Sequence, residues 1–244
     1  MPKFFVPQHS ICGNFLTLTG ENAAHARVLR LKCGDAVTVC DGSGTDFECT
    51  VSDLDTSCVS LVVKTSEPSH SEPKVKCRVF MAFAKADKLE HVIQKATELG
   101  ACEIVAFPSA RCVSRPDEKS LSKKAERWQK IAEAAAGQCG RGLIPQVTVA
   151  DSYEQALTLA SESDLALFPY ENEQQCSLRQ LIEGKSFSSV SIMTGPEGGF
   201  EEAEVAQAKA AGLQICTLGP RILRCETAPL CALTAVLYSV GALD

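Results

Sequence analysis

Two glycine-rich segments near the C-terminus combine residue types that build ligand-binding loops. Residues 195–200 are Gly-Pro-Glu-Gly-Gly-Phe, and residues 218–228 are Leu-Gly-Pro-Arg-Ile-Leu-Arg-Cys-Glu-Thr-Ala. Each segment follows a short apolar run that predicts a strand, and each precedes a helical pattern. Glycine lets the backbone turn sharply and approach a ligand closely, and open α/β sheets bind ligands beyond the carboxyl ends of their strands. The two segments therefore predict one ligand site built from neighbouring strand ends.

The loop sequences narrow the class of ligand. The chain contains no GxxxxGK[ST] string, and the first loop is not the GxGxxG of a dinucleotide site. Glu197 would also repel a pyrophosphate. A ligand without phosphates fits better, and S-adenosylmethionine is one, because backbone groups can read its adenine edge while Ile222 and Leu223 pack on its face. The alternatives are an ordinary strand-to-helix connection at 195–199 and helix-end stabilisation by Glu226.

The elements that would carry these loops fall into two regions. Residues 1–65 are typical of short strands joined by turns, with strands expected at 15–18, 36–40, 47–51 and 59–63 and one helix at 21–31. The polar stretch 66–73 contains two prolines and has the composition of a linker. Strands and helices alternate after it, which predicts a mostly parallel α/β sheet. Its strands are expected at 75–83, 103–107, 147–149, 165–168, 189–193 and 214–218. Its helices are expected at 87–99, 119–136, 201–211 and 226–240, with a further helix capped by Asp151 or Ser152.

Composition limits the class of protein further. The 244 residues are 45% hydrophobic and 22% charged, as is usual for a globular protein. No apolar run reaches the ~18 to 20 residues of a membrane span, and the first residues lack the pattern of a signal peptide. We therefore expect a cytoplasmic protein without a membrane partner. The 13 cysteines form no CxxC pair and the four histidines lack metal-ligand spacing, so no metal is expected.

Charge is distributed unevenly along the chain. The net charge is −6, yet residues 71–150 carry 14 basic and 9 acidic side chains. A local basic band can contact phosphates on an acidic protein, because charges are screened beyond about 8 to 10 Å at physiological salt. The alternative is a lysine-rich helix face that is simply solvated.

The two loops resemble the signature loops of the RsmE family, the ribosomal RNA small subunit methyltransferases that make N3-methyluridine. Residues 25–35, 88–100 and 127–141 resemble further parts of that family. The resemblance implies a small PUA-like β-barrel over residues 1–68. It implies a SPOUT-type α/β methyltransferase domain over residues 74–244, whose C-terminus forms a trefoil knot, and a homodimer. Cys225 and Pro229 stand where Thr and Ala are expected; Pro229 is tolerated in the first turn of a helix.

The resemblance and the loop chemistry together predict the residues of the site. S-adenosylmethionine is expected to contact Phe168, Thr194, Gly195, Pro196, Glu197, Gly198, Gly199, Leu218, Gly219, Ile222, Leu223 and Ala228. Catalysis is expected from Arg224, Glu226 and Thr227. RNA contacts are expected from Arg27, Arg30 and Lys32 in the first domain and from Arg111, Gln138 and Arg141 in the second.

The implied reaction is methylation of N3 of a specific uridine in 16S ribosomal RNA of the small ribosomal subunit. N3 carries a proton at neutral pH, so that proton must be removed or the anion stabilised. Arg224 would stabilise negative charge on the base, Glu226 would act as a base or orient the uridine, and Thr227 would bond the base or cap a helix. Two alternatives remain: a related SPOUT enzyme that acts at another RNA site, and an RNA-binding protein that has lost catalysis.

Overall fold

The computed structural model describes residues 2–7 and 10–243, and the chain forms two compact units. The first unit comprises residues 1–72 and 136–144, and the second comprises residues 73–135 and 145–244. Each unit contains its own cluster of buried apolar side chains. The predicted domain ranges place residues 136–144 in the second domain, whereas in the structure this segment packs with the first unit.

The first unit is a six-stranded sheet with one helix. In hydrogen-bonded order its strands are β1 (Lys3–Phe5), β4 (Ala36–Cys40), β5 (Thr45–Leu54), β6 (Cys58–Pro68), β3 (Phe15–Thr19) and β2 (Ile11–Cys12). β1 pairs with β4 in parallel, and the other pairs are antiparallel. Alternating residues such as Leu16 and Leu18 are buried, because successive side chains of a strand point to opposite faces.

Several boundaries in the first unit differ from the predictions, including the ends of α1 and β6. Helix α1 (Gly20–Val28) ends before the expected residue 31, because Arg30 adopts a left-handed backbone with φ of 56°. Strand β6 extends to Pro68, so the first residues of the predicted linker 66–73 are part of the sheet. They pair with the start of β5, where Thr45 lies opposite Pro68.

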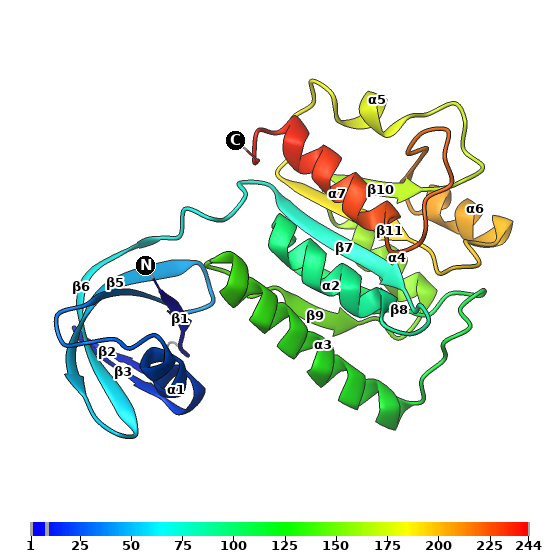
Figure 1. Ribbon diagram of the computed structural model, residues 1–244. Coiled ribbons are helices and arrows are strands. Elements are labelled where there is room, and N and C mark those ends of the chain that lie inside the picture. Colours follow the sequence, from blue (N-terminus) through cyan, green and yellow to red (C-terminus); the bar gives the residue numbers. More distant parts are fainter. Residues whose placement is uncertain (1, 8–9, 244) are drawn as a thin grey trace. The chain divides into compact units, whose positions relative to one another are not determined.

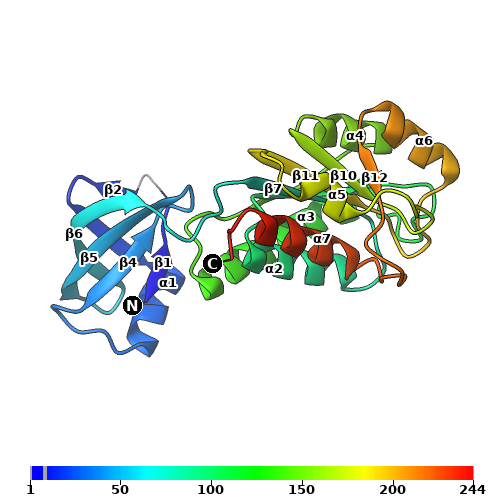
Figure 2. The same ribbon diagram turned by 90° about the horizontal axis from the view of Figure 1, so that it is seen from above.

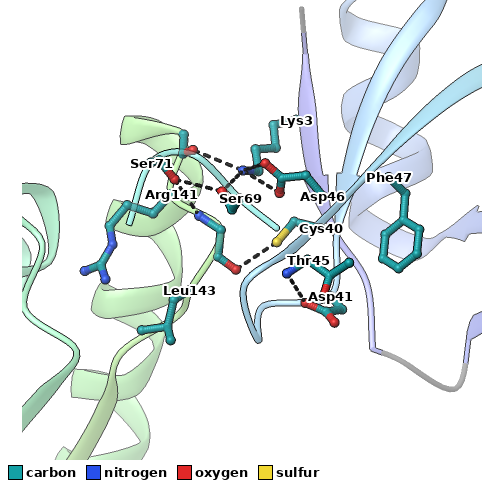
Figure 3. Close-up of polar contacts among 12 residues, drawn as sticks. Lys3, Cys40, Asp41, Thr45, Asp46, Phe47, Ser69, Ser71, Arg141 and Leu143 are labelled. Atoms are coloured by element: carbon teal, nitrogen blue, oxygen red, sulfur yellow. Dashed lines mark hydrogen bonds and ion pairs between the residues drawn. The ribbon is translucent and has the colours of Figure 1, made fainter. Parts of the chain in front are cut away.

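Residues 136–144 join the first unit through polar contacts (Figure 3). The Lys3 ammonium lies 2.8 Å from Asp46 Oδ1 and donates to the Gly140 carbonyl at 3.1 Å. The Cys40 thiol donates to the Gly142 carbonyl at 2.8 Å (Figure 3). A Cβ at Gly142 would overlap the Cβ of Ser69, so only glycine fits there. These contacts explain why a segment distant in sequence belongs to this unit.

Arg141 is buried in the same segment, with 3% of its surface exposed. Its Nη2 lies 2.6 Å from Glu72 Oε2. Burial by itself raises the pKa of Glu72. The hydrogen bond and the charge of Arg141, together with hydrogen bonds from the Leu143 and Gly142 amides, outweigh burial and hold this pKa below its usual value. The guanidinium therefore stabilises the first unit. This placement favours a structural role over the phosphate contact expected from the sequence.

Replacing Arg141 by Met is expected to lower the free energy of unfolding by about 3 kcal/mol, because it leaves a largely buried Glu72 carboxylate without its counter-ion. Chemical denaturation followed by circular dichroism measures this effect. Arg179→Met, which breaks the exposed pair between Arg179 and Glu183, is the matched control and should cost less than about 1 kcal/mol. Equal stability of the two variants, with RNA affinity lost only for the Arg141 variant, would instead support the RNA contact.

The second unit contains a parallel six-stranded sheet. In spatial order its strands are β12 (Gln214–Cys216), β10 (Leu165–Pro169), β11 (Ser189–Thr194), β7 (Lys76–Ala82), β8 (Glu103–Phe107) and β9 (Gln146–Val149). Its helices are α2 (Lys88–Leu99), α3 (Glu118–Cys139), α4 (Tyr153–Ser161), α5 (Leu178–Ile182), α6 (Glu202–Ala210) and α7 (Ala228–Ser239). The last residues of α3, from 136 onward, belong to the first unit. Every strand pair is parallel, as the alternation of strands and helices predicts.

Helices cover both faces of this sheet. α2 and α7 lie side by side on one face, and α4 covers the other (Figure 1, Figure 2). α2 buries Leu89, Val92 and Ile93 and is followed by Gly100, whose φ of 111° is the left-handed conformation typical of glycine at the end of a helix. α7 begins at Ala228 rather than at residue 226, with Pro229 in its first turn. The described chain has no helix that is long and apolar enough to span a bilayer.

The strand order locates the ligand-binding edge. The chain runs from β7 outward to β9, and then returns to build β10, β11 and β12 on the other side of β7. Ligands of such sheets bind beyond the carboxyl ends of the strands, next to the strands where the order reverses. Here that place lies between β7 and β11. The trefoil knot expected at the C-terminus stays a prediction.

Candidate functional site

A cavity of about 440 Å³ lies at the carboxyl edge of the parallel sheet. It is lined by the residues that follow β10, β11 and β12, by the first turn of α7, and by Lys88 in the first turn of α2. Twelve of the expected site residues line it: Thr194, Gly195, Pro196, Glu197, Gly198, Gly199, Leu218, Gly219, Ile222, Leu223, Arg224 and Ala228. The structure thus brings both glycine-rich loops to one cavity.

Three expected site residues do not line the cavity. Phe168 is fully buried and packs on Phe200, with ring centroids 4.4 Å apart, and Phe200 in turn lines the cavity. Phe168 therefore supports the loop from beneath. Glu226 accepts a hydrogen bond from the thiol of Cys225, which does line the cavity, at 3.2 Å. The amide of Thr227 donates to the Arg224 carbonyl at 2.9 Å and so closes the turn that precedes α7.

The first loop needs glycine at specific positions. Gly199 has a φ of 67°, and a Cβ there would lie 2.5 Å from Glu171 Oε1. A Cβ at Gly195 would lie 3.1 Å from the ring of Phe200, and one at Gly198 would lie 3.1 Å from the Cβ of Arg111. Side chains at these positions would fill space or strain the backbone. The loop therefore presents its backbone groups at the cavity surface.

Lys88, which the sequence reasoning did not single out, connects the two loops. Its ammonium lies 3.2 Å from Glu197 Oε1 on the first loop and 3.7 Å from Glu226 Oε2 at the end of the second. The hydrogen bond to Glu197 is the main cause of the raised pKa of Lys88, so the ammonium stays charged. The Lys85 amide also donates to Glu197, at 2.9 Å. The start of α2 thus fixes the position of both carboxylates.

Both carboxylates are ionised at neutral pH. Burial raises the pKa of Glu226, but hydrogen bonds from its own amide and from the Cys225 thiol, with the charges of Lys88 and Arg224, lower it overall. The pKa of Glu197 is likewise lowered against the effect of burial, by its own amide, by Lys85 and by Lys88. Burial, together with the bond to Glu226, raises the pKa of Cys225 to about 12, so its thiol remains a donor. A carboxylate with a lowered pKa is a weak base, which favours an orienting role for Glu226.

The end of β10 supplies further cavity residues that sequence reasoning missed. Pro169, Tyr170 and Glu171 line the cavity. The signal that could have found them is the one that identified the glycine loops: they directly follow a predicted strand of the same parallel sheet. Lys88 carries a similar signal, because it begins the helix that follows β7.

The residues expected to contact RNA lie in both units. Arg27, Arg30 and Lys32 are exposed around the end of α1, and the Arg27 guanidinium donates to the Thr56 carbonyl. Gln138 is exposed near the end of α3. In the second unit Arg111 donates to the Gly198 carbonyl at 3.1 Å, next to the cavity. These placements leave exposed donors at every expected RNA position except Arg141.

The chemistry available at the cavity is that of backbone groups, carboxylates and cations. Arg221 and Arg224 are exposed at its margin. Among the described residues no group of three or more His, Cys, Asp or Glu side chains could hold a metal ion. The site combines a backbone cradle with arginines that can stabilise an anion.

Comparisons with known proteins extend this description. A family model described as "RNA methyltransferase domain" matches residues 71–237, and a model described as "RNA methyltransferase PUA domain" matches residues 18–63. The chain is 37% identical over 231 residues to the Ribosomal RNA small subunit methyltransferase E of Bacillus subtilis (strain 168). This match covers 91% of this chain and 89% of that protein. It is 32% identical to the protein of the same name from Mesomycoplasma hyopneumoniae (strain 232), over 96% of this chain and 98% of that protein.

A solved structure shows the same architecture. The crystal structure of a Ribosomal RNA small subunit methyltransferase E from Neisseria gonorrhoeae bound to S-adenosyl methionine superposes with a TM-score of 0.85 and 31% sequence identity, covering 98% of this chain and 97% of that one. The similarity therefore extends over the residues of both units.

Proposed function

We propose that this chain methylates N3 of a specific uridine in 16S ribosomal RNA. The chain belongs to the family of RNA methyltransferases that contains the ribosomal RNA small subunit methyltransferases E. The observation that carries the proposal is the single cavity formed by both glycine-rich loops. The family membership supports RNA as the substrate. The uridine-N3 specificity rests on the resemblance of the loops and of the first domain to the RsmE family.

The cavity residues fit S-adenosylmethionine. The volume of about 440 Å³ is within the range of small-molecule sites, and the Glu197 carboxylate in the lining disfavours a phosphate group. A solved relative carries this cofactor in its crystal structure. Backbone groups of residues 194–199 and 218–223 would bind the adenine and ribose, with Ile222 and Leu223, which both line the cavity, packing on the adenine. When bound, the cofactor supplies an electrophilic methyl group on a sulfonium.

The residues of the chain would then act on the uridine. Arg224 would stabilise the negative charge that develops on the base oxygens as N3 gives its proton to solvent water. Glu226, held ionised by Cys225 and Lys88, would accept a hydrogen bond and orient either the uridine or Arg224. The turn closed by Thr227 keeps Arg224 at the cavity margin. We also propose that the enzyme works in the cytoplasm as a homodimer on the small ribosomal subunit and that its C-terminus is knotted.

Replacing Lys88 by Met is expected to weaken S-adenosylmethionine binding about tenfold, because two neighbouring carboxylates lose their shared charge-assisted partner and the loops separate. Isothermal titration calorimetry measures the affinity. Lys85→Met is the control, because only the backbone amide of Lys85, which the substitution keeps, bonds Glu197. Equal affinities of the two variants would show that the Lys88 ammonium does not organise the site.

The proposed substrate class is tested by offering radiolabelled S-adenosylmethionine with three RNAs. These are small ribosomal subunits from cells that lack the modification, naked 16S ribosomal RNA, and transfer RNA. Incorporation into small subunits or 16S RNA alone is the expected result. Incorporation into transfer RNA would support the related SPOUT enzyme, and RNA binding without cofactor binding would support a protein that has lost catalysis.

A further inference from the structure

The lining of the cofactor cavity contains unpaired charged groups of both signs. Glu171, Arg221 and Arg224 are exposed in this lining, and their side chains make no hydrogen bond or ion pair with any residue that the structure describes. The other two charged side chains of the lining, Lys88 and Glu197, pair with each other at 3.2 Å. One carboxylate and two guanidinium groups are therefore free to bind a ligand.

The Glu171 carboxylate lies against the first glycine-rich loop. Its Oε1 lies 2.5 Å from the position that a Cβ of Gly199 would take, and its Oε2 lies 3.6 Å from that position. The carboxylate can come this close because Gly199 has no side chain. The Gly199 amide donates to the Pro196 carbonyl at 3.0 Å. Both oxygens of Glu171 thus lie at the cavity wall and can accept hydrogen bonds from a ligand.

Arg221 leaves the sheet on the strand next to that of Glu171. β10 and β12 are parallel neighbours, and Pro169 lies opposite Cys216 in their register. Glu171 follows Pro169 by two residues, and Arg221 follows Cys216 by five. The two unpaired groups, one of each sign, therefore belong to segments that leave the sheet side by side.

Arg224 belongs to a different group of charges. It acts electrostatically on Glu226, and Glu226 Oε2 lies 3.7 Å from the Lys88 ammonium at the start of α2. This group lies where the chain passes from β7 into α2. Arg221 is thus the unpaired cation on the side of β10 and β12.

We propose that Glu171 and Arg221 form the subsite for the amino-acid end of S-adenosylmethionine. The Glu171 carboxylate accepts hydrogen bonds from the α-ammonium, and the Arg221 guanidinium donates to the α-carboxylate. This inference rests on the proposed function, from which it takes the cofactor.

The charges of the cofactor explain the match. Its amino-acid end is a zwitterion, so a subsite with one free group of each sign complements both charges, whereas the ribose hydroxyls are neutral and can bond backbone groups. An arginine can donate two parallel hydrogen bonds to a carboxylate, and hydrogen bonds between ions are stronger than neutral ones. Neither residue needs to touch the methyl group, so both determine cofactor affinity rather than the chemical step.

Four ligands separate the charges of the cofactor in isothermal titration calorimetry. S-adenosylmethionine carries all of them, and S-adenosylhomocysteine lacks only the sulfonium charge. Decarboxylated S-adenosylmethionine keeps the ammonium without the α-carboxylate, and 5′-methylthioadenosine lacks the amino-acid end and the sulfonium. The variants are Glu171→Gln and Arg221→Gln. Glu126→Gln and Arg179→Gln are the controls, because they make the same charge changes at exposed residues outside the cavity lining.

Glu171→Gln is expected to weaken binding of the three ligands that carry the ammonium about tenfold, as for the loss of one charged hydrogen-bond partner. Arg221→Gln should weaken S-adenosylmethionine and S-adenosylhomocysteine to a similar extent and leave decarboxylated S-adenosylmethionine unchanged. Neither variant should change the affinity for 5′-methylthioadenosine, and both controls should resemble wild type. All four variants should unfold at the wild-type temperature, because the substituted side chains are exposed.

Two results would overturn the subsite. Weaker binding of 5′-methylthioadenosine by the Glu171 variant would place this carboxylate on the ribose. Weaker binding of S-adenosylmethionine with unchanged binding of S-adenosylhomocysteine would assign it to the sulfonium instead. Wild-type protein that shows the expected ligand pattern but transfers no methyl group to uridine would contradict the proposed function and leave the subsite confirmed.

Discussion

Replacing Arg224 by Ala is expected to lower kcat about 100- to 1,000-fold while cofactor affinity changes less than about threefold, because its role is to stabilise charge that appears only during transfer. Arg224 lines the cavity, is exposed, and contributes its charge to lowering the pKa of Glu226. Its guanidinium makes no ion pair among the residues that the structure describes, so it remains available to a substrate. Removing it leaves the backbone cradle intact.

Single-turnover transfer from labelled cofactor to small subunits, with calorimetry of cofactor binding, separates these effects. Arg179→Ala is the control, because it removes an exposed arginine that pairs, among the residues described, only with Glu183. A kcat within a few-fold of wild type for the Arg224 variant would assign charge stabilisation to another group. A cofactor affinity that falls as much as kcat would make Arg224 a cofactor-binding residue.

Replacing Gly199 by Val is expected to weaken S-adenosylmethionine binding at least ~100-fold. The φ of 67° strains a β-branched residue, and the new side chain would displace Glu171, whose carboxylate lies 2.5 Å from the Cβ position. Both effects move the loop whose backbone forms the cradle. Calorimetry at high cofactor concentration measures the loss.

Gly184→Val is the matched control for Gly199→Val. Gly184 has a φ of 69° and open space around its Cβ position, and it does not line the cavity. Both variants should therefore lose similar thermal stability from backbone strain, about 1 to 3 kcal/mol, and only the Gly199 variant should lose the cofactor. Equal cofactor affinity in the two variants would remove Gly199 from the cradle.

The sequence predicted most of the second unit, because its information is local. Strand β8 has the bounds that its apolar run predicts, and Gly100 ends α2 in the left-handed conformation. The glycine-rich loops were recognisable because a loop that requires glycine at certain positions must have glycine at those positions in its sequence. Helix α5 was missed: its five residues are too few to display a helical period, and its capping box at Ser177 is the only local signal.

The parts that the sequence did not predict depend on contacts between distant residues. Lys88 joins two loops that follow it by more than a hundred residues, and nothing in its own neighbourhood specifies those partners. Arg141 shows a different limit of sequence reasoning. Its charge suggested a phosphate contact, but burial against Glu72 is decided by how residues 136–144 pack with the first unit. Charge is visible in a sequence, whereas burial of a charge is a property of the fold.

The most direct test of the central claim is nucleoside mass spectrometry of 16S ribosomal RNA after reaction of the protein with S-adenosylmethionine and small subunits that lack the modification. The proposed function predicts 3-methyluridine at a single position and its absence with the Arg224→Ala protein. A ribose-methylated nucleoside, or methylation of a base other than uridine, would contradict it.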